Sequence, residues 1–208
     1  MATFPILPDK TAMLFFDTLN IYLHPEDPDR RAAIEKSGVI ARMQKVNKAC
    51  REARIPVFYG QADHRPDFRD FAPHVVEGIG TPPDERPRKT TPPGVTGGSW
   101  GAEIIPELAP EAGDYIIKKH RWSTFYQTHL ELSLRTAGID TVMLAGGATE
   151  VGIASTAYSA RDRDFSLIIL RDACTSLRPE VMEMFMDKVF PMFARVMTVD
   201  EAIEGIQR

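Results

Sequence analysis

Short apolar runs recur along the chain between longer segments of mixed character. These runs are continuously apolar rather than alternating with polar positions, which is typical of strands buried on both faces of a parallel sheet. Each run is also too short for an ordinary helix. The pattern predicts six strands, at residues 11–17, 55–59, 114–118, 141–145, 165–170 and 194–197.

The segments between these runs have helical character. Apolar residues such as Val39, Met43 and Val46 recur at roughly helical spacing, and Gly138 follows an apolar pattern that it can end. Alternation of strands and helices predicts a three-layer α/β/α domain, with a mostly parallel six-stranded sheet and right-handed crossovers, over residues 1–208. The predicted helices cover residues 31–54, 130–137, 150–163, 179–190 and 199–206.

The segment 61–100 differs from the rest of the chain. It is rich in proline and glycine and has no helical or strand-like pattern. A loop of this length inside a compact domain is usually functional. We expect it to cover a site on the sheet edge, and we place no domain boundary in it.

Composition and charge narrow the class of protein. Hydrophobic residues make up 43% and charged residues 26%, as in an ordinary globular domain. Lysine and arginine number 25 against 29 aspartates and glutamates, a net charge of −4, which argues against a nucleic-acid or anionic-membrane partner. Two cysteines form no disulfide framework, and the N-terminal residues lack the pattern of a secretory signal. We expect a cytoplasmic protein that acts on a small molecule.

Polar groups gather where the predicted strands end. Asp17 ends the first strand, Lys118 and Lys119 end the third, and a glycine-rich turn at 146–152 follows the fourth. Each has an ordinary structural explanation when taken alone, as a turn aspartate, a solvated lysine or a tight turn. Parallel strands bring their carboxyl ends to one edge of the sheet, where ligands bind in such folds. The turn also opens a helix, whose free N–H groups suit an oxyanion or a carboxylate. It matches neither the dinucleotide-binding fingerprint nor the P-loop.

These residues carry a resemblance to a known family. The chain resembles the isochorismatase-like hydrolases, a superfamily that includes nicotinamidases and N-carbamoyl amidases. The resemblance extends from about residue 10 to 205 and rests on the order and spacing of residues 13–17, 119–125, 144–157 and 171–174.

The resemblance implies a set of roles for residues of this chain. Asp17 and Lys119 take the positions of the family's catalytic pair. A cis peptide bond joins Gly147 to Ala148, and it aims the Ala148 N–H into an oxyanion hole to which Gly147 and Gly152 also belong. The resemblance further implies a homodimer or homotetramer and no cofactor.

Gly152 departs from the amidases of this family, which keep a nucleophilic cysteine at that position. Glycine has no side chain that could attack an amide, so a thioester route needs another nucleophile. Cys50, Cys174 and Ser155 are the candidates, and packing is the favoured interpretation of each.

The resemblance therefore favours the branch of isochorismatases without this cysteine, which hydrolyse a vinyl ether. An acid protonates the enol carbon, and water adds to the resulting oxocarbenium-like centre. Asp17 would be the acid, and Lys119 would bind a substrate carboxylate or stabilise negative charge. We predict a hydrolase of a small, anionic, unsaturated metabolite. Two alternatives remain: an amidohydrolase with a displaced nucleophile, and an inactive member that serves as a binding or assembly module.

Several residues near the predicted strand ends suit substrate contacts. Gln61 follows the second strand and could donate a hydrogen bond to the substrate. Trp100, Trp122 and Phe125 are candidate walls that stack on an unsaturated ring or pack the loop.

We predict no metal site. Nicotinamidases hold a metal with an Asp-x-His pair and a further histidine, whereas Asp63 and His64 are adjacent in this chain and His74 lies further along. A solvated loop explains these residues.

Overall fold

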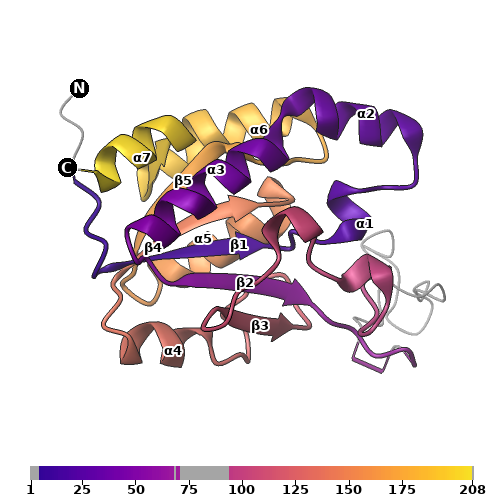
Figure 1. Ribbon diagram of the computed structural model, residues 1–208, viewed down its shortest axis with the longest axis horizontal. Coiled ribbons are helices and arrows are strands. Elements are labelled where there is room, and N and C mark those ends of the chain that lie inside the picture. The colour runs from indigo at the N-terminus through magenta and orange to yellow at the C-terminus, as the bar shows by residue number, and fades with distance from the viewer. Residues whose placement is uncertain (1–4, 68, 71–93, 208) are drawn as a thin grey trace, which may run out of the picture.

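The computed structural model describes residues 5–67, 69–70 and 94–207. It contains a six-stranded sheet whose neighbouring strands are all parallel, with helices on both faces (Figure 1). The strand order is β3-β2-β1-β4-β5-β6, which confirms the predicted three-layer α/β/α architecture. The strands are β1 (Thr11–Phe16), β2 (Val57–Ala62), β3 (Tyr115–Lys119), β4 (Thr141–Gly146), β5 (Ser166–Cys174) and β6 (Arg195–Met197).

Helices and single helical turns fill the connections. Two π-helical turns, Thr149–Ile153 and Phe185–Val189, precede α5 and follow α6 respectively. Short 3-10 turns lie at Trp100–Ala102, Pro106–Leu108 and Phe190–Met192. The α-helices are α1 (Asn20–Leu23), α2 (Pro28–Ser37), α3 (Val39–Glu52), α4 (Leu130–Thr136), α5 (Ala154–Arg161), α6 (Pro179–Met184) and α7 (Val199–Ile206).

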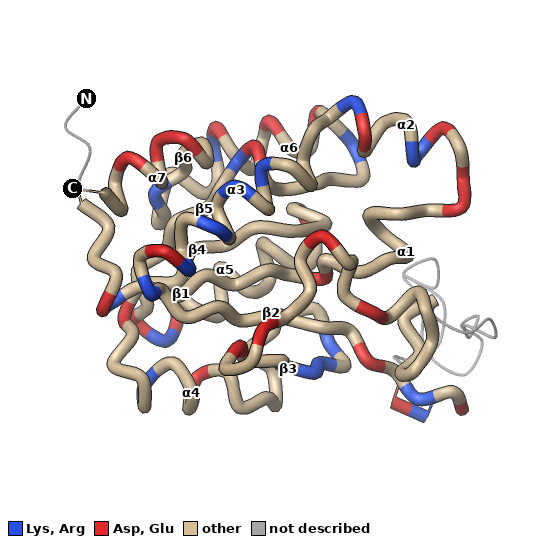
Figure 2. Tube along the Cα trace, viewed as in Figure 1, with Lys and Arg blue, Asp and Glu red and all other residues tan. Residues whose placement is uncertain are grey.

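Strand β1 shows how the two faces of the sheet are covered. Successive side chains point to opposite faces of a strand. Met13 and Phe15 are buried in the cluster formed with α3 and α7, whereas Leu14 and Phe16 belong to the cluster formed with α4 and α5. Strands β1, β2 and β4 carry no charged residue, and charges lie mainly on helices and connections (Figure 2). The central strands are therefore apolar on both faces.

The helix predicted over residues 31–54 is two helices. Gly38 stands between α2 and α3 with φ +67°, and its amide donates to the Glu35 carbonyl. Such a left-handed residue ends a helix, and glycine adopts it without steric cost. The periodic apolar pattern runs across this break, so it gave no sign of the turn.

Strand β2 begins and ends at later residues than the sequence predicted. It begins at Val57, after Pro56, and continues to Ala62 rather than ending at residue 59. Gln61 is consequently a strand residue and not a loop residue. Strand β5 also runs further than predicted, to Cys174.

The predicted cover over residues 61–100 is described only at its two ends. The His64 amide donates to the Val95 carbonyl at 2.9 Å, and the Gly97 amide donates to the His64 carbonyl at 2.8 Å. These bonds join the start and the end of the segment. Residues 71–93, including His74, lie outside the described residues.

A search of the described helices finds none that combines the length and the apolar character needed to cross a membrane.

Candidate active site

Asp17 and Lys119 meet at the carboxyl edge of the sheet. The Lys119 Nζ lies 2.8 Å from Asp17 Oδ2, and the two residues are only 4% and 8% exposed. Lys119 is the last residue of β3, and Asp17 follows β1, so the ammonium reaches past the end of the intervening β2. The two groups that the resemblance paired are thus in direct contact.

The backbone around Asp17 fixes the direction of its carboxylate. Asp17 has φ +45°, and its amide donates to the Gly60 carbonyl at 2.8 Å. The Ala62 amide donates to Asp17 Oδ1 at 2.9 Å, while Lys119 holds the other oxygen. Each carboxylate oxygen therefore has its own donor.

Burial is the main influence on the protonation of Asp17. It raises the pKa of the carboxyl above the ordinary value, because the charged form loses contact with water. The Lys119 ammonium and the Ala62 amide act in the opposite direction and do not reverse the shift. The carboxyl thus holds its proton to higher pH than an exposed aspartate does.

The pair faces a cavity of about 730 Å³. Its floor includes Phe16 and the turn Gly146–Gly147–Ala148, and its walls come from α1, α2 and the segment after β5. A cavity of this size accommodates a small organic molecule. The lining residues are Phe16, Asp17, Tyr22, Leu23, Arg30, Ala33, Ile34, Lys119, Trp122, Gly146, Gly147, Ala148, Val151, Gly152, Thr175, Ser176, Leu177 and Pro179.

The glycine-rich turn offers one backbone donor rather than three. The peptide bond between Gly147 and Ala148 is cis, as the resemblance implied. The Gly147 amide donates to the Phe16 carbonyl at 3.2 Å, and the Gly152 amide donates to the Ala148 carbonyl at 3.0 Å, so both are already used. Within the described part of the chain, the Ala148 amide has no hydrogen-bond partner. The predicted three-residue oxyanion hole is therefore reduced to Ala148.

Phe16 occupies the space that a side chain at position 152 would need. A Cβ atom built on Gly152 would lie 2.0 Å from Cε1 and 2.1 Å from Cζ of the Phe16 ring. The ring is 2% exposed and belongs to the core, so it has little freedom to move aside. The Lys119 Nζ also lies 4.2 Å from the centroid of this ring, within the range of a cation–π contact.

The sequence of this chain matches that of a known family. The Isochorismatase domain matches residues 11–201. The chain belongs to the isochorismatase family.

Relatives of this isochorismatase-family chain include one protein named only by its family and two that are named as enzymes. YwoC of Bacillus subtilis, an isochorismatase family protein, is 36% identical over 106 residues, or 51% of this chain, and the match spans only 56% of YwoC. The ureidoacrylate amidohydrolase RutB of Methylobacterium radiotolerans is 31% identical over 180 residues, which are 83% of this chain and 70% of RutB. The N-carbamoylsarcosine amidase of an Arthrobacter species is 28% identical over 196 residues, which are 94% of this chain and 71% of the amidase.

Solved structures share the fold. An isochorismatase-like hydrolase from Alkaliphilus metalliredigens superposes with a TM-score of 0.76 at 31% identity, covering 94% of this chain and 97% of that one. A cysteine hydrolase from Pseudomonas syringae pv. phaseolicola gives a TM-score of 0.80 at 24% identity, covering 98% and 95%, and this likeness supports the fold alone. The chain therefore shares its fold with these two proteins.

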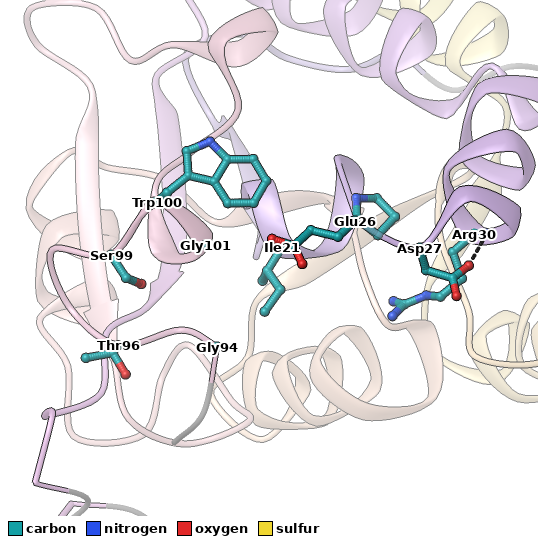
Figure 3. A pocket seen from close by; sticks show the side chains of 10 residues that line it. Ile21, Glu26, Asp27, Arg30, Gly94, Thr96, Ser99, Trp100 and Gly101 are labelled. Carbon is teal, nitrogen blue, oxygen red and sulfur yellow. Dashed lines mark hydrogen bonds between the residues drawn. The ribbon is translucent and has the colours of Figure 1, made fainter. Parts of the chain in front are cut away.

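Of the four side chains predicted to contact substrate, only Trp122 lines the cavity with Asp17 and Lys119. Gln61 instead donates to the Ala102 carbonyl at 2.7 Å, because β2 extends past it and directs it to the 3-10 turn. Phe125 is 4% exposed and packs on Phe165 in the core, with ring centroids 5.6 Å apart. Trp100 lines a separate cavity (Figure 3).

None of the three alternative nucleophiles, Cys50, Cys174 and Ser155, is among the described residues that line the cavity. Cys50 and Cys174 are buried, and burial raises the pKa of each thiol to about 12, so neither is a ready thiolate. These positions agree with the packing roles favoured from the sequence.

One cluster of side chains could hold a cation, and it includes His64 but not Asp63. Asp63 forms an ion pair with Lys118 at 2.8 Å. Ligand atoms of His64, Asp70 and His120 lie within 4.8 Å of one another, a set that could hold a metal ion. The Asp70 carboxylate also accepts the Arg65 amide at 3.0 Å, so the cluster has protein hydrogen bonds of its own. The absence of a metal therefore stays a prediction.

Sequence reasoning missed the residues on the α1–α2 side of the cavity, Tyr22 and Arg30 among them. One available signal was Asp27 followed by Pro28, a helix cap and a first-turn proline. It would have placed Arg30 in the first turn of a helix. The contact between Phe16 and Gly152 has no sequence signal, because it forms only when β1 and the turn after β4 come together.

We predict that Gly152→Ala lowers the free energy of unfolding by about 1–3 kcal/mol, because the new methyl group overlaps the buried Phe16 ring. A cysteine at this position would carry the same Cβ. In a double-mutant cycle, Phe16→Leu should relieve part of the overlap, so the double variant is more stable than the sum of the single changes predicts. Denaturant unfolding of the four proteins measures this coupling. Strict additivity would show that the ring does not restrict position 152.

Proposed function

We propose that this isochorismatase-family protein hydrolyses a small, anionic, unsaturated metabolite without a cysteine nucleophile. The observation that carries the proposal is the buried contact of 2.8 Å between Asp17 and Lys119 in the lining of the cavity. Position 152 nearby is a glycine, and the Phe16 ring occupies the space that a side chain there would need. The site therefore has a carboxyl group that can transfer a proton, Asp17, and no nucleophilic side chain at position 152. Hydrolysis then depends on proton transfer and on direct attack by water.

The favoured reaction is hydrolysis of a vinyl ether. Protonated Asp17 gives its proton to the enol carbon, and the electron pair of the double bond forms the new C–H bond. The ether oxygen stabilises the adjacent cationic carbon, water adds to that carbon, and the released proton returns to the Asp17 carboxylate. The resulting hemiketal then separates into a carbonyl compound and an alcohol. The raised pKa of Asp17 supports this role, since a general acid must hold its proton at the working pH.

Lys119 stabilises the Asp17 carboxylate that forms when the proton is transferred. When Asp17 has lost its proton, the ammonium 2.8 Å away stabilises the charge that remains. The Phe16 ring beneath the Lys119 Nζ favours a cation at the same place. The Ala148 amide faces the same cavity and can donate to a substrate oxygen.

Hydrolysis of a C–N bond is the second candidate, and the relatives favour it. RutB is named a ureidoacrylate amidohydrolase and the Arthrobacter protein an N-carbamoylsarcosine amidase. With no nucleophile at position 152, Asp17 would have to act as a base toward water, and Ala148 would bind the oxyanion. A third candidate is an inactive member that binds small acids. Turnover of any compound by the wild-type protein but not by Asp17→Asn excludes this third candidate.

The pH dependence of kcat/KM separates the first two candidates. If Asp17 is a general acid, kcat/KM falls as the pH rises through its pKa, which burial shifts upward. If Asp17 is a general base, kcat/KM falls as the pH drops through the same pKa. We expect the first profile on a vinyl ether. Measurement over the full pH range, on a panel of small vinyl ethers and ureido acids, checks the sign.

We predict that Asp17→Asn lowers kcat by at least about 100-fold, the usual contribution of a general acid. The variant also removes the carboxyl partner of the buried Lys119, which can destabilise the protein. Circular dichroism must therefore first establish the temperatures at which Asp17→Asn is folded. A kcat close to that of the wild type in a folded Asp17→Asn protein contradicts the role of Asp17.

We predict that the double variant Cys50→Ala/Cys174→Ala keeps kcat within about threefold of the wild type. Both thiols are buried and neither is among the described residues that line the cavity, so replacement should affect packing more than chemistry. Substitution is a better test than alkylation, because a reagent reaches these buried thiols only when the protein opens. Loss of activity in a folded double variant would restore a cysteine mechanism.

A cytoplasmic location and assembly as a homodimer or homotetramer stay predictions. Size-exclusion chromatography with light scattering measures the second of these directly.

A further inference from the structure

Two cavities of the described structure share one residue, Arg30. The first is the cavity that contains Asp17 and Lys119. The second measures about 510 Å³ and is lined on its far side by Thr96, Ser99 and Trp100 (Figure 3). The Arg30 side chain projects from α2 into this second cavity and is also part of the wall of the first.

The guanidinium of Arg30 is not committed to a protein partner. Its backbone amide donates to Asp27 Oδ1 at 2.8 Å, which fixes the residue in the first turn of α2. Within residues 5–67, 69–70 and 94–207, its side chain has no hydrogen bond and no ion pair. The neighbouring Arg31 differs, since its Nε donates to the Pro25 carbonyl at 3.1 Å.

Arg30 lies close enough to the acid to share its electrostatic surroundings. Partial burial and the Asp17 carboxylate raise the pKa of Tyr22 to about 12, whereas the Arg30 guanidinium lowers it. Tyr22 therefore senses both charges, and all three residues line the first cavity. A molecule held between Asp17 and Arg30 would lie along Tyr22.

We propose that Arg30 binds the carboxylate of the substrate and so sets the position of the hydrolysable bond beside Asp17. The location of that bond rests on the proposed function. Lys119 is the less suitable group for the carboxylate, because its ammonium is already paired with Asp17. A single guanidinium can hold a carboxylate through two parallel hydrogen bonds. Glu26 and Asp27 line the second cavity beside Arg30, and their negative charge disfavours a phosphate dianion more strongly than a monocarboxylate.

Binding of simple carboxylates tests this assignment without a known substrate. The probes are benzoate and crotonate, with benzamide and crotonamide as uncharged counterparts of the same shape. The proteins are the wild type, Arg30→Gln, Arg30→Lys and Lys36→Gln. Lys36 lies in the last turn of the same helix and is not among the described residues of either cavity, so its replacement gives the same change in net charge. Calorimetry or NMR titration gives each Kd.

We expect Arg30→Gln to weaken binding of both carboxylates by about 10-fold or more, the effect of losing a hydrogen bond to a charged group. Binding of the two amides should be unchanged, Lys36→Gln should behave as the wild type, and Arg30→Lys should recover part of the affinity. Equal loss in Arg30→Gln and Lys36→Gln would indicate a general charge effect and overturn the proposal. So would equal binding by the wild type and Arg30→Gln, or no binding of either carboxylate by the wild type at tens of millimolar.

This outcome is independent of the test on Asp17. Binding without turnover reports on Arg30 alone, whereas Asp17→Asn is judged by kcat. If Arg30→Gln loses carboxylate binding and Asp17→Asn keeps its kcat, only the proposed reaction fails. If the reverse holds, only the role of Arg30 fails.

Discussion

The contact between Asp17 and Lys119 is the constraint around which the site is arranged. The Asp17 carboxyl and the Lys119 ammonium lie 2.8 Å apart, and both residues are almost entirely removed from water. A buried charge of this kind requires a partner and further hydrogen bonds, and loss of either partner leaves the other uncompensated. The Ala62 amide and the Phe16 ring supply the remaining contacts, one on each side of the pair. Strands β1, β2 and β3 must therefore keep their register for the pair to exist at all.

That register connects the sheet to the cavity. Ala62 at the end of β2 pairs with Lys119 at the end of β3, and Phe16 at the end of β1 pairs with Gly146 at the end of β4. Because Phe16 pairs with Gly60, β2 and β3 end two residues beyond the level at which β1 and β4 end. A Cβ atom at Gly146 would lie 2.0 Å from the Phe16 carbonyl oxygen, so the turn after β4 approaches β1 as closely as the backbones permit. Because of this close approach, Ala148 and Gly152 line the same cavity as Asp17.

The sequence was sufficient for the sheet, because continuously apolar runs located its six strands. Those runs also placed Asp17, Lys118 and Lys119 at strand ends, whereas the choice of Asp17 and Lys119 as a pair came from the family resemblance, with which their contact agrees. The substrate contacts were less predictable. Gln61 was misplaced because β2 starts two residues later and runs three residues further than the apolar run indicates. Phe125 follows Lys119 closely in the sequence but turns into the core. Arg30 escaped notice because α2 has no buried residue, and the apolar pattern that predicted this helix begins only at Ile34.

Phe16 fills the space beside Gly152 and places its ring against the Lys119 ammonium. The same ring therefore closes the position from which a thiol would attack and supports the cation that balances Asp17. Since one apolar ring serves both purposes, restoring a nucleophile would weaken the environment of Lys119. A side chain at position 152 and the present position of the Phe16 ring are thus incompatible in this chain.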